Sequence, residues 1–528
     1  MPNAATADTA HRWATNRAID LWVLFEGDLD AATLAVIHGQ LAEIRADAAR
    51  AAVIAPSGCE PTSGEASVAD LIVAGPRPPS PFGVFTALEA VGLSDVRRVG
   101  ILGASVPALE AGHHAGVGAI VGLAAADSDA RRALLGGEPD VIVEAGRLGA
   151  VVADRWGSGR RRRELVLLNP GPSVTSERVH RAIGGPDLCH REPEYVELFA
   201  SVRTKLLRVA GVDDEWGVVL IGGSGTAALE AMTGAFVRPG RRLLVCQNGH
   251  YGERIATIAS RLGVDVVAVN ASHTEPIDPA EVARALEANP GVDAVAVVHH
   301  ETTTGLLNPV QEIAAVADSH GVLLLTDAIS SFGAEQLDLD GRGIDVVAGT
   351  SNKCLHGLPG VAFLLVSPRA QARADQAPAR SLYFDIPSYL RAQDRRTVPF
   401  TPAIPAIYAL DAALDELFDE GLEPRREHYR ARMAYLDREF ERLGFTPVVA
   451  AEHRSASVRS LPLPSGVRYE DLHDALKARG YVIYAGLGEA AATSFRVCAL
   501  GNLEIGALQG FIGSLEGLLV GSVLPTNP

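Results

Sequence analysis

Short apolar runs alternate with segments of helical period along most of the chain. Residues 19–25 (IDLWVLF) form one such run, residues 30–49 repeat apolar positions at helical spacing, and residues 51–55 are apolar again. The same alternation returns from about 216 to 367. Strands that alternate with helices indicate parallel sheets with crossover helices, so the pattern predicts two α/β regions, the first within residues 18–150.

The pattern changes at about residue 401. Two long amphipathic helices are predicted at 405–422 and 426–444, and the shorter strand and helix patterns that follow are typical of a small α+β unit. Between the two α/β regions, Arg160 to Arg163 form a run that is typical of a solvated connector, although a basic binding patch would look the same. The predicted plan is an α/β domain at 18–150, a linker at 151–163, a larger α/β domain at 164–400 and a smaller C-terminal domain at 401–522.

Composition narrows the classes of function. The 528 residues are 47% hydrophobic and carry a formal net charge of −17, which is typical of a globular protein and argues against nucleic acid and acidic membranes as partners. The absence of a signal-peptide pattern and of a long apolar stretch favours a cytoplasmic location. The five cysteines form no C-x-x-C pair, so we expect reduced, mostly buried thiols and no metal site.

Lysine is rare in this chain, and only Lys205, Lys353 and Lys477 supply it. Lys205 and Lys477 fall in amphipathic helical patterns, where a lysine is ordinarily a solvated surface residue. Lys353 follows the apolar run 344–349, which predicts a loop at the C-terminal end of a strand, where ligands bind in open α/β sheets. A lysine amine can lose its proton and attack a carbonyl, whereas arginine cannot. From this segment alone, a surface loop lysine is an equal interpretation.

Two upstream segments favour a chemical role for Lys353. The stretch VVLIGGSGTAALEAM predicts a strand, a glycine-rich turn and a helix start, and it places Ser224, Gly225 and Thr226 where N–H groups and hydroxyls can hold a phosphate. A buried strand ends at Asp327, whose carboxylate either caps a turn or faces a cationic ring nitrogen. A phosphate anchor, a partner for a pyridinium nitrogen and a reactive amine are together what pyridoxal 5′-phosphate (PLP) requires.

These segments resemble the class V aminotransferases of PLP fold type I, and within them the 2-aminoethylphosphonate:pyruvate transaminase group. The similar stretches span roughly residues 164–510 and include NPGP, GGSGTAALEAM, NGHYGERIA, HHETTTGLLNP, LLLTDAISSFGA, SNKCLHGLPG, PFTPAIP and SFRVCALGN. The resemblance implies a large α/β domain with a mixed, mostly parallel sheet and a small C-terminal α+β domain. It also implies a homodimer with the active site at the subunit interface.

The resemblance assigns roles residue by residue. Lys353 would bind the cofactor covalently and move the proton between the substrate α-carbon and the cofactor C4′, and Asp327 would pair with the pyridine nitrogen. The other implied contacts are Ser224, Gly225 and Thr226 at the phosphate, Tyr251 on the ring, Thr302 or its neighbour Thr303 near the phenolic oxygen, Asn352 beside the lysine, Thr401 from the partner subunit, and Arg496 with His190 and Arg191 around the anionic group of the substrate. Without the resemblance, a core tyrosine and a surface ion pair would be the ordinary interpretations of Tyr251 and Arg496.

The implied reaction moves the amino group of 2-aminoethylphosphonate to pyruvate and yields phosphonoacetaldehyde and L-alanine. Three alternatives stay open at this point. The protein could be a class V transaminase or lyase with another small amine donor, a bifunctional transaminase and phosphonoacetaldehyde hydrolase with an active N-terminal domain, or a nucleotide-binding protein that uses GGSG.

Residues 18–150 resemble, more faintly, the Rossmannoid core of the haloacid dehalogenase (HAD)-like hydrolases, particularly the phosphonoacetaldehyde hydrolase branch. Glu26 stands at the position of the nucleophilic aspartate, although Asp28 is close. Ala104 and the Val106–Pro107 region replace the acids of the metal loop.

That branch also uses a lysine of its cap domain, and no lysine occurs before Lys205. We therefore expect a degenerate, non-catalytic domain, in which Asp28, Ser57 and Arg77 could still bind a phosphonate or a phosphate.

Overall fold

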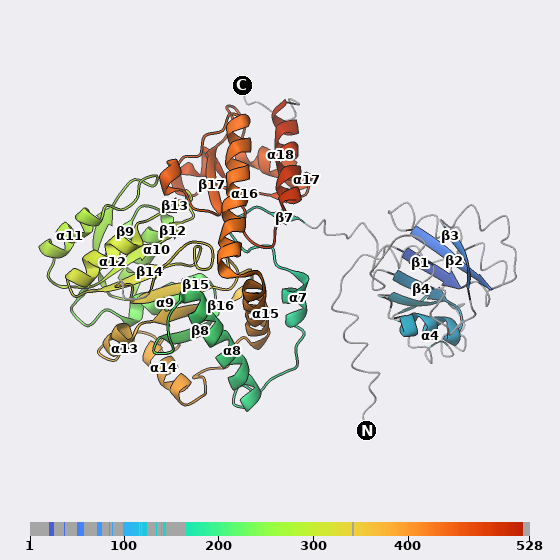
Figure 1. Cartoon of the computed structure of the whole chain (residues 1–528), viewed down its shortest axis with the longest axis horizontal. Helices are drawn as coiled ribbons and strands as arrows, with labels where there is room; N and C mark the ends of the chain where they lie inside the picture. The colour runs from blue at the N-terminus through green and yellow to red at the C-terminus, as the bar shows by residue number, and fades with distance from the viewer. Residues whose placement is uncertain are drawn as a thin grey trace. The chain divides into compact units, whose positions relative to one another are not determined.

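The computed structural model describes the chain as two compact units, Met1–Glu164 and Leu165–Pro528 (Figure 1). The described residues are 165–520 except 340–342 and 378, and before them 21–25, 36, 50–56, 71–75, 84, 87, 99–115, 117, 119–123, 134, 139 and 141–143. None of the helices formed by these residues is both long and apolar enough to cross a membrane.

The first unit contains a six-stranded parallel sheet in the order β3-β2-β1-β4-β5-β6. Its elements are β1 (Leu21–Phe25), β2 (Arg50–Pro56), β3 (Leu71–Gly75), β4 (Val99–Gly103), α4 (Val106–Ala115), β5 (Ala119–Leu123) and β6 (Val141–Val143). Leu109 of α4 is buried in one cluster with Val23 of β1 and Ile101 of β4. The predicted parallel sheet is confirmed for these residues, and its strand order is that of doubly wound α/β sheets.

The relationship of this unit to HAD-like hydrolases stays a prediction. Glu26, Asp28, Ser57, Arg77 and the linker 151–163 lie outside the described residues. After β4, where the metal loop is predicted, Ser105 Oγ accepts a hydrogen bond from Ala108 N at 3.4 Å and α4 begins at Val106. This turn therefore presents Ala104 and a helix-capping serine, neither of which carries a carboxylate.

The second unit is built on a seven-stranded sheet in the order β10-β9-β11-β14-β15-β16-β8. Its strands are β8 (Gly217–Gly223), β9 (Arg242–Gln247), β10 (Asp265–Asn270), β11 (Val292–Val298), β14 (Leu323–Asp327), β15 (Val346–Thr350) and β16 (Gly360–Val366). Only β16 among them runs antiparallel to its neighbours. The sheet is therefore mixed and mostly parallel, as predicted.

Helices cover both faces of this sheet because apolar side chains occupy consecutive strand positions. In β9, Leu244 belongs to one buried cluster, whereas Leu243 and Val245 belong to another. The first cluster includes residues of α8 (Pro193–Ala210), α11 (Pro279–Ala288), α12 (Val310–Ser319) and α15 (Ile404–Glu420). The second includes residues of α9 (Gly225–Ala235), α10 (His250–Arg261), α13 (Pro368–Ala374) and α14 (Ile386–Asp394).

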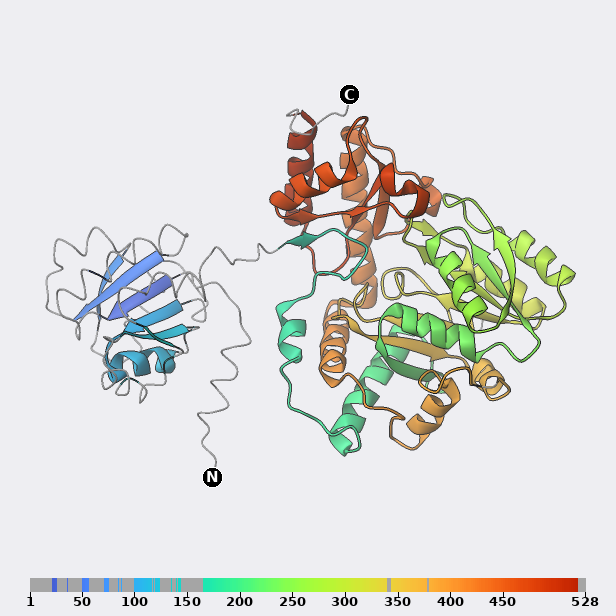
Figure 2. The same cartoon turned by 180° about the vertical axis from the view of Figure 1, so that it is seen from behind.

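The C-terminal part of this unit has its own core, formed around a three-stranded antiparallel sheet in the order β17-β20-β19 (Figure 2). Its elements are α16 (Leu422–Arg442), η7 (Ala451–His453), β17 (Val458–Pro462), α17 (Tyr469–Ala478), β18 (Tyr481–Val482), β19 (Tyr484–Ala485), η8 (Gly488–Ala492), β20 (Ser494–Cys498) and α18 (Ile505–Val520). The short strand β7 (Val166–Leu167) pairs with β18, so the beginning of the unit joins this part. The remaining short elements are α7 (Glu177–Ala182), β12 (His300–Glu301) and β13 (Leu306–Leu307).

Candidate active site

Three loops meet at one edge of the seven-stranded sheet. The strands β8, β14 and β15 end at Gly223, Asp327 and Thr350, and they run in the same direction. Their carboxyl ends therefore share one edge. Ser224 follows β8 directly and Lys353 lies in the loop after β15. The structure thus places the glycine-rich turn, the strand-end carboxylate and the lysine on the same side of the sheet.

The Lys353 side chain packs against the segment that leads from β7 to α7. Its Nζ donates to the carbonyl oxygen of Pro170, and a Cβ built on Gly171, whose φ is +121°, would lie 2.5 Å from Nζ. The two segments are also joined by their main chains, since Ser173 N donates to Asn352 O at 3.0 Å. Burial lowers the pKa of Lys353, which leaves more of the amine unprotonated and reactive.

Asp327 is a buried carboxylate whose Oδ1 accepts a hydrogen bond from Ile329 N at 2.9 Å. The residue is only 3% exposed, and burial raises its pKa to about 7. Glu301 nearby also raises this pKa, while Lys353 and Arg254 lower it. A cationic group next to Asp327 would stabilise the charged carboxylate.

The glycine-rich turn predicted to hold a phosphate lies at the N-terminus of α9. Ser224 is the N-cap residue, but its side chain makes no capping hydrogen bond, so its exposed hydroxyl is free to bind an anion together with the first N–H groups of the helix. A Cβ on Gly225 would lie 2.7 Å from the Ile329 side chain, which brings this turn close to the end of β14. The Arg254 guanidinium reaches Thr226 Oγ1 at 3.5 Å.

Tyr251 and Thr302 are positioned through Glu301. The buried Glu301 side chain accepts from Tyr251 N at 3.1 Å and from Gly252 N at 3.3 Å, and it therefore caps α10. It also accepts from Thr303 Oγ1 at 2.6 Å. The hydroxyl of Thr303 is thereby committed, whereas Thr302 Oγ1 is buried without a hydrogen-bond partner among the described residues. Of the two threonines, Thr302 has the hydroxyl that a ligand could bind.

Arg496 reaches this edge from β20 of the C-terminal part. Its Nε donates to Ala485 O at 2.8 Å and its Nη1 donates to Thr302 O at 3.0 Å. The residue is 3% exposed, its hydrogen bonds go to carbonyl oxygens, and it makes no ion pair with a carboxylate in the described part of the chain. The surface ion pair considered for it is absent there, and Nη2 is available for an anion.

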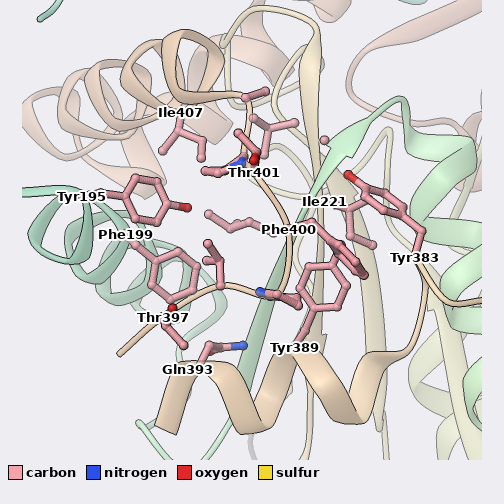
Figure 3. Close-up of a pocket in the computed structure, with 17 residues that line it drawn as sticks. Tyr195, Phe199, Ile221, Tyr383, Tyr389, Gln393, Thr397, Phe400, Thr401 and Ile407 are labelled. Carbon is pink, nitrogen blue, oxygen red and sulfur yellow. The ribbon is translucent and has the colours of Figure 1, made fainter. Parts of the chain in front are cut away.

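Three predicted site residues lie elsewhere on the chain. Thr401 is exposed and lines a cavity of about 20 Å³ whose walls do not include Lys353 or Asp327 (Figure 3). His190 is half-buried and Arg191 is exposed in the loop before α8. The predicted role of Thr401 is at the subunit interface and those of His190 and Arg191 are in the substrate pocket, and all three stay predictions.

Two residues at this edge were missed by the sequence analysis. The guanidinium carbon of Arg254 lies 4.7 Å from the centre of the Tyr251 ring and Arg254 reaches Thr226, so it brings positive charge to the glycine-rich turn. Its signal is the spacing of three residues from Tyr251, which puts both on one helix face. Glu301 caps a helix whose own N-cap residue, Gly249, has no side chain to do so.

The residues present fit PLP. The free α9 N-terminus with Ser224 and Arg254 suits a phosphate, and a buried carboxylate with a raised pKa suits a protonated ring nitrogen. The unpartnered hydroxyl of Thr302 suits the phenolic oxygen, and Lys353 is an amine of lowered pKa. No group of three or more metal-ligating side chains occurs among the described residues.

Comparison with known proteins points to one family. The model of the class V aminotransferases matches residues 176–502. The 2-aminoethylphosphonate–pyruvate transaminase of Vibrio vulnificus is 35% identical over 359 residues, which are 67% of this chain and 97% of that protein. The protein of the same name from Burkholderia pseudomallei is 37% identical over 361 residues, covering 68% and 97%.

Solved structures give the same fold. An aspartate aminotransferase of subgroup IV from Thermus thermophilus is 30% identical with a TM-score of 0.61, covering 66% of this chain and 99% of that one. An alanine–glyoxylate aminotransferase from Nostoc sp. is 28% identical with a TM-score of 0.64, covering 67% and 95%. The family match at residues 176–502 lies within the second unit.

Proposed function

Because the chain belongs to the class V aminotransferases, which depend on PLP, we propose that it transfers the amino group of 2-aminoethylphosphonate, or of a closely related aminophosphonate, to pyruvate. The products are phosphonoacetaldehyde and L-alanine. One observation supports an anionic substrate: the buried guanidinium of Arg496 donates to two carbonyl oxygens and has no carboxylate partner in the described part of the chain. The names of the similar transaminases supply the choice of phosphonate.

PLP, when bound, supplies an electron sink that allows a bond at the amine-bearing carbon of the substrate to break. Lys353 takes a proton from that carbon of the amine donor in one half-reaction and gives a proton to C2 of pyruvate in the other, because burial leaves its amine unprotonated more often than in water. Asp327 holds a protonated ring nitrogen through its buried carboxylate. Ser224, Thr226 and Arg254 bind the phosphate.

Arg496 orients both substrates. Its Nε and Nη1 are anchored on Ala485 O and Thr302 O, so the plane of the guanidinium is fixed. A fixed guanidinium can bind two oxygens of a phosphonate or of a carboxylate, which lets one residue serve the amine donor and pyruvate in turn.

A panel of amine donors with pyruvate tests the substrate. We expect L-alanine to form fastest with 2-aminoethylphosphonate and more slowly with aspartate or serine. Donor disappearance and alanine formation are measured together by chromatography. If 2-aminoethylphosphonate gives no alanine while another donor does, the substrate is wrong but the transaminase family still holds.

Replacing Arg496 with lysine should raise KM for both 2-aminoethylphosphonate and pyruvate by about 10–100-fold, since one or two charge-assisted hydrogen bonds are lost. Steady-state kinetics with each substrate varied in turn measure this. Arg468→Lys is the matched control, because Arg468 makes an exposed ion pair with Asp471 in the same C-terminal part. A rise in KM for only one substrate would contradict the shared role of Arg496.

We infer a homodimer with residues of one subunit completing the site of the other. The support is that Thr401 is exposed, and that two large apolar side chains, Leu382 and Tyr383, are 83% and 37% exposed and could be covered by a second subunit. Sedimentation of the full chain measures the subunit number.

The cytoplasmic location stays a prediction.

We also infer that the first unit is a degenerate HAD-like domain without hydrolase activity. The support is its parallel sheet and the turn after β4, where Ala104 and Ser105 provide no carboxylate for a divalent cation. The bifunctional alternative would require ligands from elsewhere in the unit.

A further inference from the structure

Tyr429 of α16 is a buried side chain at the junction between the two cores of the second unit. It packs in a small cluster with Ala334 and Cys354 of the large part and with Val458 and Cys498 of the C-terminal part. Figures 1 and 2 show α16 running from the C-terminal part toward α15. A side chain in this place contacts both the loop that carries Lys353 and the strand region that carries Arg496.

On the large-part side, the Tyr429 hydroxyl meets His356. Tyr429 Oη and His356 Nε2 are 2.7 Å apart, and both side chains are buried. His356 N donates to Lys353 O at 3.0 Å and so closes the turn that begins at the lysine. The turn that begins at Lys353 therefore ends at the residue that contacts Tyr429.

His356 has a backbone conformation that L-residues rarely adopt. Its φ is +61°, and Arg396 is the only other non-glycine residue with positive φ in the described part of the chain. Glycine or asparagine is the usual residue in this region. A histidine here adopts an unfavourable backbone angle, and its ring forms a hydrogen bond with Tyr429. A glycine would fit the angle better but could not form this bond.

On the C-terminal side, the same hydroxyl meets the turn after β20. Gly501 N donates to Tyr429 Oη at 3.4 Å, and Arg432 Nη1 donates to Gly501 O at 3.1 Å. Gly501 also pairs with Val174, which lies in the segment whose Pro170 carbonyl accepts from Lys353. The contacts therefore form a closed ring from the lysine through His356, Tyr429, Gly501 and the segment before α7, and back to the lysine.

Gly501 N–H can only donate, so the Tyr429 hydroxyl oxygen accepts from it. A second hydrogen bond joins the hydroxyl to His356 Nε2, and its direction depends on the tautomer of the ring. His356 is a neutral imidazole. Burial lowers its pKa well below its ordinary value, and Arg425 and Arg432 lower it further.

We propose that the Tyr429 hydroxyl is a positioning group that joins the Lys353 loop to the turn behind Arg496, with His356 as its contact on the lysine side. This goes one step beyond the proposed function and rests on it only for the role of Lys353 in transamination. Because the ring of contacts is closed, removal of the hydroxyl loosens the lysine loop and the turn after β20 together.

The chain contains only three lysines, which makes a direct test practical. The full chain, with PLP removed, is treated with trinitrobenzenesulfonate, and the labelling rates of Lys353 and Lys477 are read by peptide mass spectrometry. In Tyr429→Phe we expect Lys353 to label at least about threefold faster relative to Lys477, because its amine leaves the Pro170 carbonyl more often. In the PLP-bound enzyme we expect kcat/KM to fall about tenfold or more.

Two further variants make the test specific. His356→Gly keeps the positive φ and removes the ring, and we expect it to match Tyr429→Phe, with no added effect in the double variant. Ser367→Ala is the matched control, since Ser367 is a buried hydroxyl that also donates to one group and accepts from another, after the far end of β16. It should leave Lys353 labelling unchanged.

Unchanged Lys353 labelling in Tyr429→Phe, an equal increase in Ser367→Ala, or additive effects in the double variant would each overturn the proposal. If Tyr429→Phe does not fold, His356→Gly decides the matter alone. The labelling needs neither substrate nor PLP, so failure of the donor panel would leave its outcome intact.

Discussion

Replacement of Lys353 by alanine should lower the transamination rate by at least about 10⁴-fold, because one residue both holds the cofactor and moves the proton. Lys353 is the lysine whose amine is desolvated at the sheet edge. Lys205 cannot replace it, since its Nζ lies 2.7 Å from Asp411 and 2.5 Å from Asp415. The purified variant should also lose the visible absorption of covalently bound PLP, which borohydride reduction and mass measurement check independently of activity.

Two further variants test whether the effect comes from the Lys353 amine itself. One keeps the positive charge without a lysine amine, and the other removes a different lysine. Lys353→Arg keeps a positive charge and should be as inactive as the alanine variant, because a guanidinium does not give up its proton. Lys477→Ala changes a lysine on α17 and should remain active. A Lys353→Ala protein that still bound PLP covalently and reacted at the normal rate would refute the assignment of this site.

The second large effect is expected at Asp327. Its pKa is about 7 in the folded protein and about 3.9 in an unfolded chain. Between these values the folded state holds more protons, so the free energy of unfolding of the PLP-free protein falls as the pH rises. From pH 5 to pH 8, wild type should lose about 2–3 kcal/mol more than Asp327→Asn, whose amide does not titrate. Denaturant unfolding at a series of pH values measures this difference.

Bound PLP should offset the loss of unfolding free energy that the charged Asp327 causes at high pH. A protonated ring nitrogen beside Asp327 favours the charged carboxylate, so PLP should stabilise wild type more than Asp327→Asn at pH 8. We also expect kcat of Asp327→Asn to fall about 10²–10³-fold. Asp345→Asn is the control, because Asp345 is likewise buried but precedes β15 at the opposite edge and pairs with Arg369. Equal losses of kcat in both variants would indicate a general effect of burying an amide.

Much of the second unit could be predicted from sequence pattern. The helices predicted at 405–422 and 426–444 are α15 and α16, and the strand before Lys353 is β15. These elements have strong periodicity or uninterrupted apolar runs, so local patterns suffice. The placement of Ser224, Asp327 and Lys353 at one edge follows from the rule for parallel strands.

Other features depend on contacts between distant segments and have no local signal. The pattern at 481–486 predicts one strand, but β18 and β19 are two short strands that pair with different partners. Helix α18 was not predicted; it is apolar and rich in glycine, which weakens a helical pattern. The bond between His356 and Tyr429 joins residues that are 73 positions apart.

The site residues divide in the same way. Residues on one strand end or one helix start could be named from their motifs, as Asp327 and Ser224 were. Glu301 could not, because its role comes from four main-chain and side-chain donors, two at the start of α10 and two on Thr303. Thr302 and Thr303 are adjacent and chemically alike, and only the occupied hydroxyl of Thr303 distinguishes them.

The pairing of β7 with β18 gives the C-terminal layer two attachments to the catalytic edge. One is Arg496 on β20, and the other is the stretch that leaves β7 and brings the Pro170 carbonyl to the lysine amine. A rigid rotation of this layer would therefore move Arg496 and the Pro170 carbonyl, which accepts from the lysine amine, at the same time. Under the proposed function, such a rotation would couple binding of the substrate anion at Arg496 to release of the lysine amine from the Pro170 carbonyl.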